Sequence, residues 1–447
     1  MQAMFTCNGL FTSQRSLEQI FDQELRYLGT LRLGDKNHGN YRIDNQAQSV
    51  EVGGGPDGAA VTAVFRSGIG CLAMAPGMTK EAIAQLPEIE RPTPPHDLSQ
   101  LAWPHGDLII ESTLGSGISQ SALNAASDWA FTAHAVGEDT TSLLIIHQGN
   151  LIYERYAPGF DYSTRTRTWS AAKSMEAVII GLRVDSGHMG LDDPLPLNWL
   201  PESKGVKQDP RSNITLRHAL NMATGLYPLD NAGMANAAGS GLAYWGGSGY
   251  ATQIRHRGLI REPGSHWDYE NYDSLLAVYA LKKTFESDQD YLQFPYVALL
   301  NKIGMHSTLL GTDRFGDFIL SSQVFSNARD LGRFGLLLLN QGKWFGDQII
   351  SEEWIDFMRT PTPAAATRGS DYGGHWWLVP DARKQEVPAD AFSAAGSRGQ
   401  YVTVIPSHDI VIVRRGLDFA GAAFDQWSLV RKVLKAFPPS KSPTENR

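Results

Sequence analysis

Two residues that could do chemistry, Ser170 and Lys173, stand three positions apart in an S-x-x-K sequence. Apolar residues follow at helical spacing: Met175, Val178, Ile179 and Leu182. Side chains three positions apart lie on one side of a helix, so the hydroxyl and the amine are expected to meet. A serine needs a base to become a good nucleophile, and a partly buried lysine can be neutral near pH 7. The pair therefore predicts nucleophilic catalysis, with backbone N–H groups at the helix start facing a developing oxyanion.

Tyr269 and Asn271 form a second candidate group, in a turn-rich loop that runs into an apolar helix. The pattern predicts that they alternate on a short extended piece, so both side chains could enter one cleft. A tyrosine near the lysine could relay a proton, and an asparagine amide could hold a substrate carbonyl or amide. The alternative is a capping loop with a packed tyrosine. S-x-x-K alone is a weak signal, because a chain of 447 residues should contain about one by chance.

Other catalytic motifs have little support in the sequence. It contains neither G-x-S-x-G nor H-E-x-x-H, and histidines such as His105, His256 and His375 are scattered, as structural histidines are. Residues 53–58 spell G-x-G-x-x-G, but Pro56 removes a backbone donor and no helix begins there, which favours a hairpin turn. We therefore expect no metal and no organic cofactor.

The elements that must position these residues fall into three predicted parts: a small α/β module at 1–90, a proline-rich linker at 91–118, and a hydrolase-like domain at 119–440. The module is predicted to hold a helix at 17–28 and strands at 49–52 and 60–65. The larger domain is predicted to hold helices at 121–133 and near the C-terminus, strands at 142–147, 151–156, 400–405 and 410–415, and a helical subdomain at about 190–325. Strands at both ends with helices between them predict an α+β fold with an antiparallel sheet.

Composition excludes several classes of function. A formal net charge of −8 argues against a nucleic-acid partner, and no apolar run is long enough to span a membrane. The N-terminus shows no secretion signal, although a chain already cut at its signal would look the same. The two cysteines, Cys7 and Cys71, are either buried free thiols or one disulfide tying the N-terminal tail to a strand end.

The order of the motifs resembles the serine β-lactamase and penicillin-binding-protein superfamily. Ser170-Ala-Ala-Lys173 followed by Tyr269-Glu-Asn271 is most similar to its class C-like branch, which includes esterases, D-aminopeptidases and 6-aminohexanoate-dimer hydrolases. Residues 214–226 and 328–335 resemble helices of that branch, and the likeness runs from about 140 to 435. Residues 7–11 and 66–71 look like the leading segment of exported members. The resemblance implies a β-lactamase/transpeptidase-like fold and a periplasmic or otherwise exported location; a cytoplasmic one is the alternative.

The family's third motif, Lys-Thr-Gly or His-Thr-Gly, resembles the stretch Gly396-Ser-Arg-Gly-Gln-Tyr401. Gly399 stands at the glycine and would let substrate approach the strand. The cation is replaced by Ser397, with Arg398 beside it, and Arg398 could either take over its electrostatic part or point away. This departure favours hydrolysis of esters or amides over efficient β-lactam hydrolysis.

The resemblance implies acyl transfer from a small-molecule ester or amide through an acyl-enzyme on Ser170. Lys173 or a Lys173–Tyr269 pair would accept the proton, Asn271 would orient the substrate, and the N–H groups of Ser170 and Gln400 would form the oxyanion hole. The rival hypothesis is a non-catalytic, penicillin-binding-like module. Trp245, Trp267, Trp376 and Trp377 are candidates for an apolar cleft. The sequence leaves the oligomeric state open.

Overall fold

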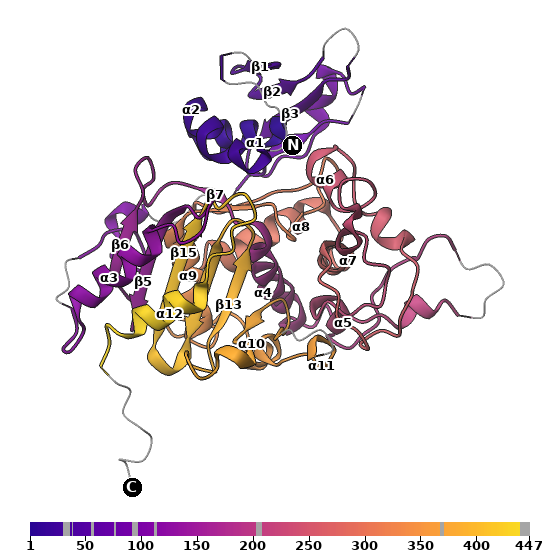
Figure 1. Ribbon diagram of the computed structural model, residues 1–447. Coiled ribbons are helices and arrows are strands. Elements are labelled where there is room, and N and C mark those ends of the chain that lie inside the picture. The colour runs from indigo at the N-terminus through magenta and orange to yellow at the C-terminus, as the bar shows by residue number, and fades with distance from the viewer. Residues whose placement is uncertain are drawn as a thin grey trace.

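The computed structural model describes residues 1–29, 36–37, 39–54, 58–75, 77–91, 97–110, 114–202, 208–366 and 371–438 (Figure 1). They form an α+β fold with antiparallel sheets and a mostly helical insertion, as predicted. Within these residues no helix combines the length and the apolar character needed to cross a bilayer.

The described residues of 1–90, called here the N-terminal module, contain a four-stranded antiparallel sheet. Its strands, in spatial order, are β1 (Tyr41–Asp44), β2 (Ser49–Val52), β3 (Val61–Arg66) and β4 (Gly70–Ala73). Helix α1 (Gln2–Cys7) packs on this sheet, and a helical stretch follows as α2 (Leu17–Gln19), Ile20–Glu24 and Leu25–Leu28. The predicted β2–β3 hairpin is present, although residues 55–57 of its turn lie outside the described residues.

A disulfide joins Cys7 at the end of α1 to Cys71 in β4, with their Cα atoms 6.1 Å apart. The alternative of two free thiols is therefore wrong. The bond fixes α1 to the strand beneath it, so the helix that faces the rest of the protein is held in place at its C-terminal end.

The proline-rich stretch predicted as a linker lies partly outside the described residues, at 92–96 and 111–113. Its described part is tied to the larger domain. The Trp103 indole donates to Gly149 O at 2.9 Å, and the buried Arg333 guanidinium binds Pro104 O and Asp107 at 2.9 and 2.7 Å. These contacts hold residues 97–110 against the domain.

The larger domain is organised around a six-stranded antiparallel sheet (Figure 1). Its spatial order is β12 (Trp377–Leu378), β13 (Phe392–Gly396), β14 (Gln400–Ile405), β15 (Ile410–Gly416), β5 (Thr140–His147) and β6 (Asn150–Tyr156). The two predicted hairpins, β5–β6 and β14–β15, are joined where β15 pairs with β5, with Ile412 opposite Ile145. Strands from both ends of the domain thus share one sheet.

The sheet is covered on both faces, as the alternation of its apolar side chains requires. Leu143 and Ile145 face α3 (Gln120–Phe131) and α12 (Gln426–Leu434), whereas Leu144 and Ile146 face the main core with α4 (Ala172–Asp185) and α9 (Ala328–Leu339). Helix α4, which follows the candidate nucleophile, is buried along most of its length.

The chain between α4 and α9 forms most of the helical region. Its helices are α5 (Leu216–Leu220), α6 (Gly241–Trp245), α7 (Asn271–Lys282) and α8 (Asp288–Pro295). The small sheet β7 (Thr166–Arg167), β9 (Val324–Ser326) and β8 (Leu309–Leu310) ties this region to the segment before α4. After α9 come β10 (Lys343–Trp344), β11 (Asp347–Gln348), α10 (Glu352–Arg359) and α11 (Pro363–Ala366).

Candidate active site

Ser170 lies on a tight turn between β7 and α4. The turn spans Trp169–Ala171, and Trp169 has a left-handed backbone with φ of 52°. Thr168 N donates to Val324 O at 2.8 Å, which fixes the start of the turn on β9. Ser170 is half-buried, whereas Ala171 and Ala172 behind it are buried in the core. The turn therefore presents the hydroxyl at the surface of a rigid helix.

Lys173 reaches the serine hydroxyl from one helical turn further on. Its Nζ lies 3.4 Å from Ser170 Oγ, 2.6 Å from Asn271 Oδ1 and 2.8 Å from Ser321 O. The lysine side chain is only 1% exposed. Burial lowers the pKa of Lys173, against the opposing effect of the nearby Tyr244 phenol and of acidic side chains around it. A lowered pKa favours the neutral amine, the form that can accept a proton.

Asn271 orients the lysine through both ends of its amide. Its Oδ1 accepts from Lys173, while its Nδ2 donates to Asp230 Oδ2 at 2.6 Å and to Ser240 Oγ at 3.3 Å. Asn271 is the first residue of α7, capped by Glu270, so the expectation of an extended piece through this residue is wrong. Both amide atoms are therefore engaged inside the protein, and Asn271 helps to hold the Lys173 amine in place.

Tyr269, in the loop before α7, lies on another side of Lys173. Lys173 Nζ lies 5.0 Å from the centre of the Tyr269 ring. Burial raises the pKa of the Tyr269 phenol, and a hydrogen-bonding interaction with the Ser170 side chain opposes part of that rise. A phenol with a raised pKa keeps its proton, so this geometry suits proton donation better than it suits a phenolate base.

The end of β13 lies directly against the nucleophile turn. A Cβ atom at Gly396 would lie 3.1 Å from Ser170 N and 2.9 Å from Ala171 N, and would clash with Thr168 O. Glycine at position 396 thus permits the closest approach of strand to turn. Ser397, the next residue, is exposed at the tip of the β13–β14 hairpin.

Arg398 points away from Ser170, which decides between the two orientations expected for it. Its side chain is 5% exposed, and Nη1 forms an ion pair with Glu24 Oε2 at 2.9 Å. Further donors bind the carbonyls of Gln23 and Leu417 at 2.9 and 3.0 Å. A left-handed backbone at Arg398, with φ of 61°, turns the side chain toward the N-terminal module. Arg398 is a tether between the two parts of the chain, not a substitute for the family's cation.

Gly399 and Gln400 are both engaged by other parts of the protein. A Cβ atom at Gly399 would clash with the Arg414 guanidinium and the Asp418 carboxylate, which form a buried ion pair at 2.8 Å. This glycine makes room for that pair and not for a substrate. Gln400 is buried on β14, where it is the ladder partner of Gly396 and lies one strand further along the sheet. Gly396 is the residue that lies against the serine backbone, as the neighbours of its added Cβ atom show.

A buried pair of titratable groups lies behind Lys173. Glu176, one turn further along α4, is fully buried, and neither of its carboxyl oxygens has a hydrogen-bond partner in the described part of the chain. His375 Nε2 lies 3.4 Å from Glu176 Oε1. Burial raises the pKa of Glu176 well above its ordinary value and lowers the pKa of His375 well below its ordinary value. Burial thus favours the neutral form of both groups.

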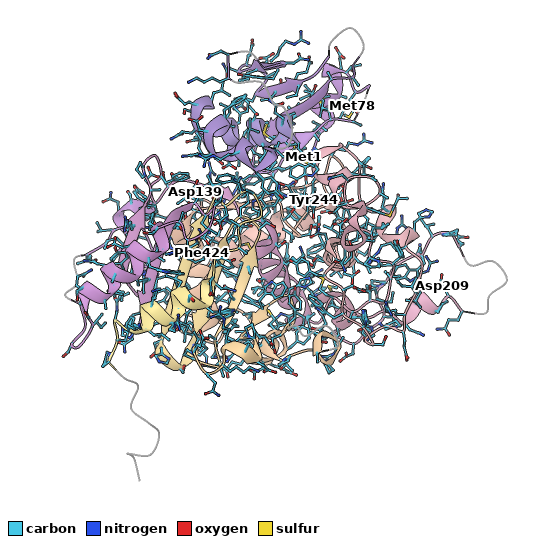
Figure 2. All side chains as sticks on the ribbon, in the orientation of Figure 1. Met1, Met78, Asp139, Asp209, Tyr244 and Phe424 are labelled. Carbon is cyan, nitrogen blue, oxygen red and sulfur yellow. A yellow bond between two sulfur atoms is a disulfide. The ribbon has the colours of Figure 1, made fainter. Side chains whose placement is uncertain are left out.

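Aromatic rings line one side of the site. Trp377 lies 5.5 Å from Tyr269 and 6.1 Å from Trp267, measured between ring centres. The other two predicted cleft tryptophans lie elsewhere: Trp376 is buried against Phe334 and Phe392, and Trp245 lies at the junction with the N-terminal module. Figure 2 shows the side chains that fill this junction, where the labelled Met1 and Tyr244 lie.

Sequence reasoning missed several residues that the structure brings to the site: Asp230, Ser240, Ser321, Glu176 and Gly396. Ser321 contacts Lys173 through its backbone carbonyl, and a backbone contact cannot be predicted from the type of residue. Asp230 and Ser240 are polar residues in an irregular region and give no spacing pattern. Glu176 stands at i+3 from Lys173 on a buried helix face, and that spacing could have identified it. Within the described residues, no cluster of three or more His, Cys, Asp or Glu side chains could hold a metal ion.

The family model named Beta-lactamase matches residues 132–414, which covers more than half of the chain. The chain belongs to the beta-lactamase family. The match includes the serine turn, α7 and the β13–β14 hairpin, so the predicted family membership is confirmed. An uncharacterized protein of Alkalihalophilus pseudofirmus is 23% identical over 320 residues, which cover 67% of this chain and 91% of that protein.

Several solved structures share the fold. A Bacillus anthracis protein assigned as a 6-aminohexanoate-dimer hydrolase has a TM-score of 0.55 at 22% identity, covering 67% of this chain and 81% of that one. A family VIII carboxylesterase has a TM-score of 0.55 at 14% identity, covering 74% and 100%. A D-stereospecific amidohydrolase from Streptomyces sp. has a TM-score of 0.51 at 19% identity, covering 70% and 97%. These likenesses confirm the predicted fold class.

Proposed function

We propose that this protein is a serine hydrolase that cleaves an ester or amide bond of a small molecule through an acyl-enzyme on Ser170. The observation that carries the proposal is the position of Lys173, whose buried amine lies 3.4 Å from the half-exposed Ser170 hydroxyl. Membership of the beta-lactamase family and the fold of the carboxylesterase and amidohydrolase structures support the same reaction class.

In the first half-reaction, Lys173 accepts the Ser170 proton as the serine oxygen attacks the substrate carbonyl carbon. Burial lowers the lysine pKa and raises the tyrosine pKa, which favours Lys173 over Tyr269 as the base. Tyr269 then donates a proton to the leaving alkoxide or amine and regains one from the Lys173 ammonium. In the second half-reaction, water attacks the acyl-enzyme, Lys173 accepts the proton of the water, and this proton passes to Ser170 Oγ as the bond between the acyl carbon and Oγ breaks.

The tetrahedral intermediate carries a negative oxygen that needs fixed donors. Ser170 N is one donor, and Gly396 lies against it. We assign the second donor to the N–H of Ser397, because this residue follows Gly396 and is exposed at the mouth of the site. The assignment replaces Gln400, which lies on the next strand of the sheet.

The substrate is proposed to be a small ester or amide with an apolar portion. Trp377, Tyr269 and Trp267 provide an aromatic surface for an acyl or amide chain beside Ser170. The side chain of Arg398 is occupied by Glu24, so it does not provide a cation for a substrate carboxylate. This supports hydrolysis of uncharged esters and amides.

The decisive experiment combines turnover with labelling. We expect release of p-nitrophenol from p-nitrophenyl acetate or butyrate by the wild type, and none above background by Ser170→Ala. A serine-reactive phosphonate should add one label to the wild type, found by mass spectrometry on the peptide containing Ser170. If the wild type neither turns over nor becomes labelled, the non-catalytic binding hypothesis is correct. A parallel screen of D-peptides, aminohexanoate oligomers and a β-lactam would define the substrate.

We also propose that the protein functions in an oxidising compartment outside the cytoplasm. The disulfide between Cys7 and Cys71 supports this, because such bonds persist where thiols are not kept reduced. Fractionation of the source cells, followed by detection of the protein with an antibody, tests the location. Recovery with the cytoplasmic markers would contradict it.

A further inference from the structure

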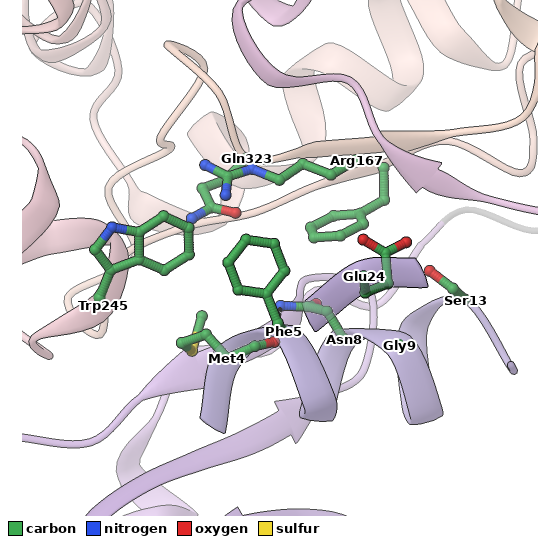
Figure 3. Close-up of a pocket in the computed structure, with 10 residues that line it drawn as sticks. Met4, Phe5, Asn8, Gly9, Ser13, Glu24, Arg167, Trp245 and Gln323 are labelled. Atoms are coloured by element: carbon green, nitrogen blue, oxygen red, sulfur yellow. Dashed lines mark hydrogen bonds between the residues drawn. The ribbon is translucent and has the colours of Figure 1, made fainter. Parts of the chain in front are cut away.

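The N-terminal module contacts the segment that leads to the nucleophile. The Phe5 ring of α1 stacks on Trp245 at 5.4 Å and lies 6.0 Å from the ring of Trp169. Between the two parts lies a small cavity, lined on the module side by Met4, Phe5, Asn8, Gly9, Ser13 and Glu24. Figure 3 shows Phe5 of the module facing Arg167 and Gln323 across this junction.

Two buried donors in this cavity have no partner within the described residues: Arg167 Nη1 and Gln323 Nε2. Arg167 is 8% exposed and Gln323 is 4% exposed. The other guanidinium nitrogens of Arg167 are used, because Nε donates to Ser322 O at 3.0 Å and Nη2 donates to Ser322 Oγ at 2.7 Å. Arg167 and Gln323 line the same cavity, and Figure 3 shows both side chains on the side opposite Phe5. Unsatisfied buried donors are costly, so both call for an acceptor.

The surroundings carry an excess of positive charge. Four buried guanidinium groups gather here: Arg15, Arg167, Arg398 and Arg415. The nearby Glu24 carboxylate is shared by Arg15 at 2.8 Å and Arg398 at 2.9 Å. Neither Arg167 nor Arg415 forms an ion pair with any described residue. Arg415 donates only to uncharged oxygens, including the carbonyl of Arg167. A buried cation without a counter-charge is unfavourable.

We propose that the cavity beside Arg167 and Gln323 binds a small monovalent anion, with chloride or bromide as its chemical class. A water molecule would accept the two hydrogen bonds but would leave the charge unbalanced. The cavity volume is only about 20 Å³, which is too small for sulfate, phosphate or a carboxylate ligand. Glu24 also lines the cavity, and its charge is already balanced by Arg15 and Arg398.

The anion site is linked to the nucleophile turn through Arg167. The guanidinium carbon of Arg167 lies 3.9 Å from the centre of the Trp169 ring, and Trp169 precedes Ser170 in the chain. Ser322, which holds Arg167, follows Ser321, whose carbonyl accepts from Lys173. An anion that fixes Arg167 therefore stabilises both segments that position the serine and the lysine.

Thermal unfolding tests the site without relying on catalysis. The protein is titrated with sodium chloride or bromide against sodium gluconate at constant ionic strength. We expect the wild type and Ser170→Ala to gain about 2–4 °C in Tm with saturation, as binding to the native state requires. Gln323→Leu and Arg167→Met should lose the halide response, while Arg217→Gln, which removes an exposed arginine paired with Asp192, should keep it. Equal halide responses in all variants, or none in the wild type, would overturn the proposal.

A bromide-soaked crystal provides a readout that does not depend on any variant. Anomalous scattering should show one bromide between Arg167 Nη1 and Gln323 Nε2. A water molecule at this position, with no anomalous signal at high bromide concentration, would refute the anion site even if the two variants failed to fold. Because Ser170→Ala should bind the anion as well as the wild type, failure of the proposed hydrolase activity would leave this result unaffected.

Discussion

The amine of Lys173 lies 2.6 Å from the amide oxygen of Asn271, closer than its 3.4 Å from the Ser170 hydroxyl. The two residues are 98 positions apart in the sequence. Lys173 lies in the first turn of α4, and Asn271 is the first residue of α7. Asn271 is itself held by Asp230 at 2.6 Å. The Lys173 amine, the proposed base, is therefore positioned by a chain of hydrogen bonds that starts outside the S-x-x-K motif.

Replacement of Lys173 by alanine should remove almost as much activity as replacement of Ser170, because nucleophile and base act as one unit. We expect both variants to lose at least about a thousandfold in kcat/KM for p-nitrophenyl butyrate. Thermal melting should confirm that they fold. A Lys173→Ala variant that keeps most of the activity would show that another group is the base.

The variant Asn271→Asp should shift the pH dependence of hydrolysis. A carboxylate 2.6 Å from the amine stabilises the ammonium form and raises the pKa of Lys173. The neutral base then appears only at higher pH, so the acidic limb of kcat/KM should move up by about 1–3 pH units. Asn340→Asp, at the C-terminal end of α9, is the control and should leave the profile in place. An unshifted limb in Asn271→Asp would mean that Lys173 does not titrate in this limb.

The variant Gly396→Ala should lose activity while remaining folded. Its methyl group would press on the backbone of Thr168, Ser170 and Ala171, and so displace the nucleophile turn from β13. A displacement of this kind should cost about a hundredfold in kcat/KM. The matched control Ser397→Ala alters an exposed side chain and keeps the backbone N–H, so its activity should resemble that of the wild type. If both variants lost activity to a similar extent, the loss in Gly396→Ala could not be attributed to a clash with the backbone of the serine turn.

The variant Arg398→Met should lower stability and leave KM for neutral esters unchanged. It removes one of the two ion pairs of Glu24, which keeps Arg15, and it leaves the carbonyls of Gln23 and Leu417 without this donor, at a cost of about 1–3 kcal/mol in the free energy of unfolding. Urea unfolding gives this number, and steady-state kinetics gives KM. A raised KM with unchanged stability would instead support contact between Arg398 and the substrate.

The variant Glu176→Gln should change how stability depends on pH. Burial raises the pKa of Glu176, so the folded protein keeps a proton that the unfolded chain releases above about pH 4.5. Because the unfolded state then binds fewer protons, the free energy of unfolding falls by about 1.4 kcal/mol per pH unit until Glu176 ionises in the folded state. Glutamine cannot ionise, so this slope should be absent in the variant.

Urea unfolding at several pH values between 5 and 8 measures that slope. The exposed carboxyl of Glu353 provides the control, and Glu353→Gln should follow the wild-type curve. The pKa of His375 is lowered in the folded protein. His375 therefore lowers the free energy of unfolding when the pH falls below the ordinary pKa of histidine, and it does so equally in the wild type and in both variants. Parallel curves for the wild type and Glu176→Gln would mean that Glu176 is ionised in the folded protein.

Local patterns predicted the elements well, because apolar alternation and helical spacing reflect burial. The hairpin of β14 and β15 and the helix after Ser170 follow from such patterns. The side chain of Arg398 could not be placed in this way, since its direction depends on a left-handed turn and on Glu24, 374 positions earlier. The start of α7 at Asn271 was missed because a polar loop with a glutamate cap does not differ in pattern from an extended segment.

The close contact at Gly396 has a consequence for protein engineering. In random mutagenesis of the β13–β14 hairpin, every substitution at position 396 should give an impaired protein, because any added side chain would clash with the backbone around Ser170. The neighbouring Ser397 and the aromatic Trp377 offer atoms to solvent and can vary without that collision. A search for new substrate preferences would therefore gain most from libraries that keep position 396 constant and randomise these two neighbours.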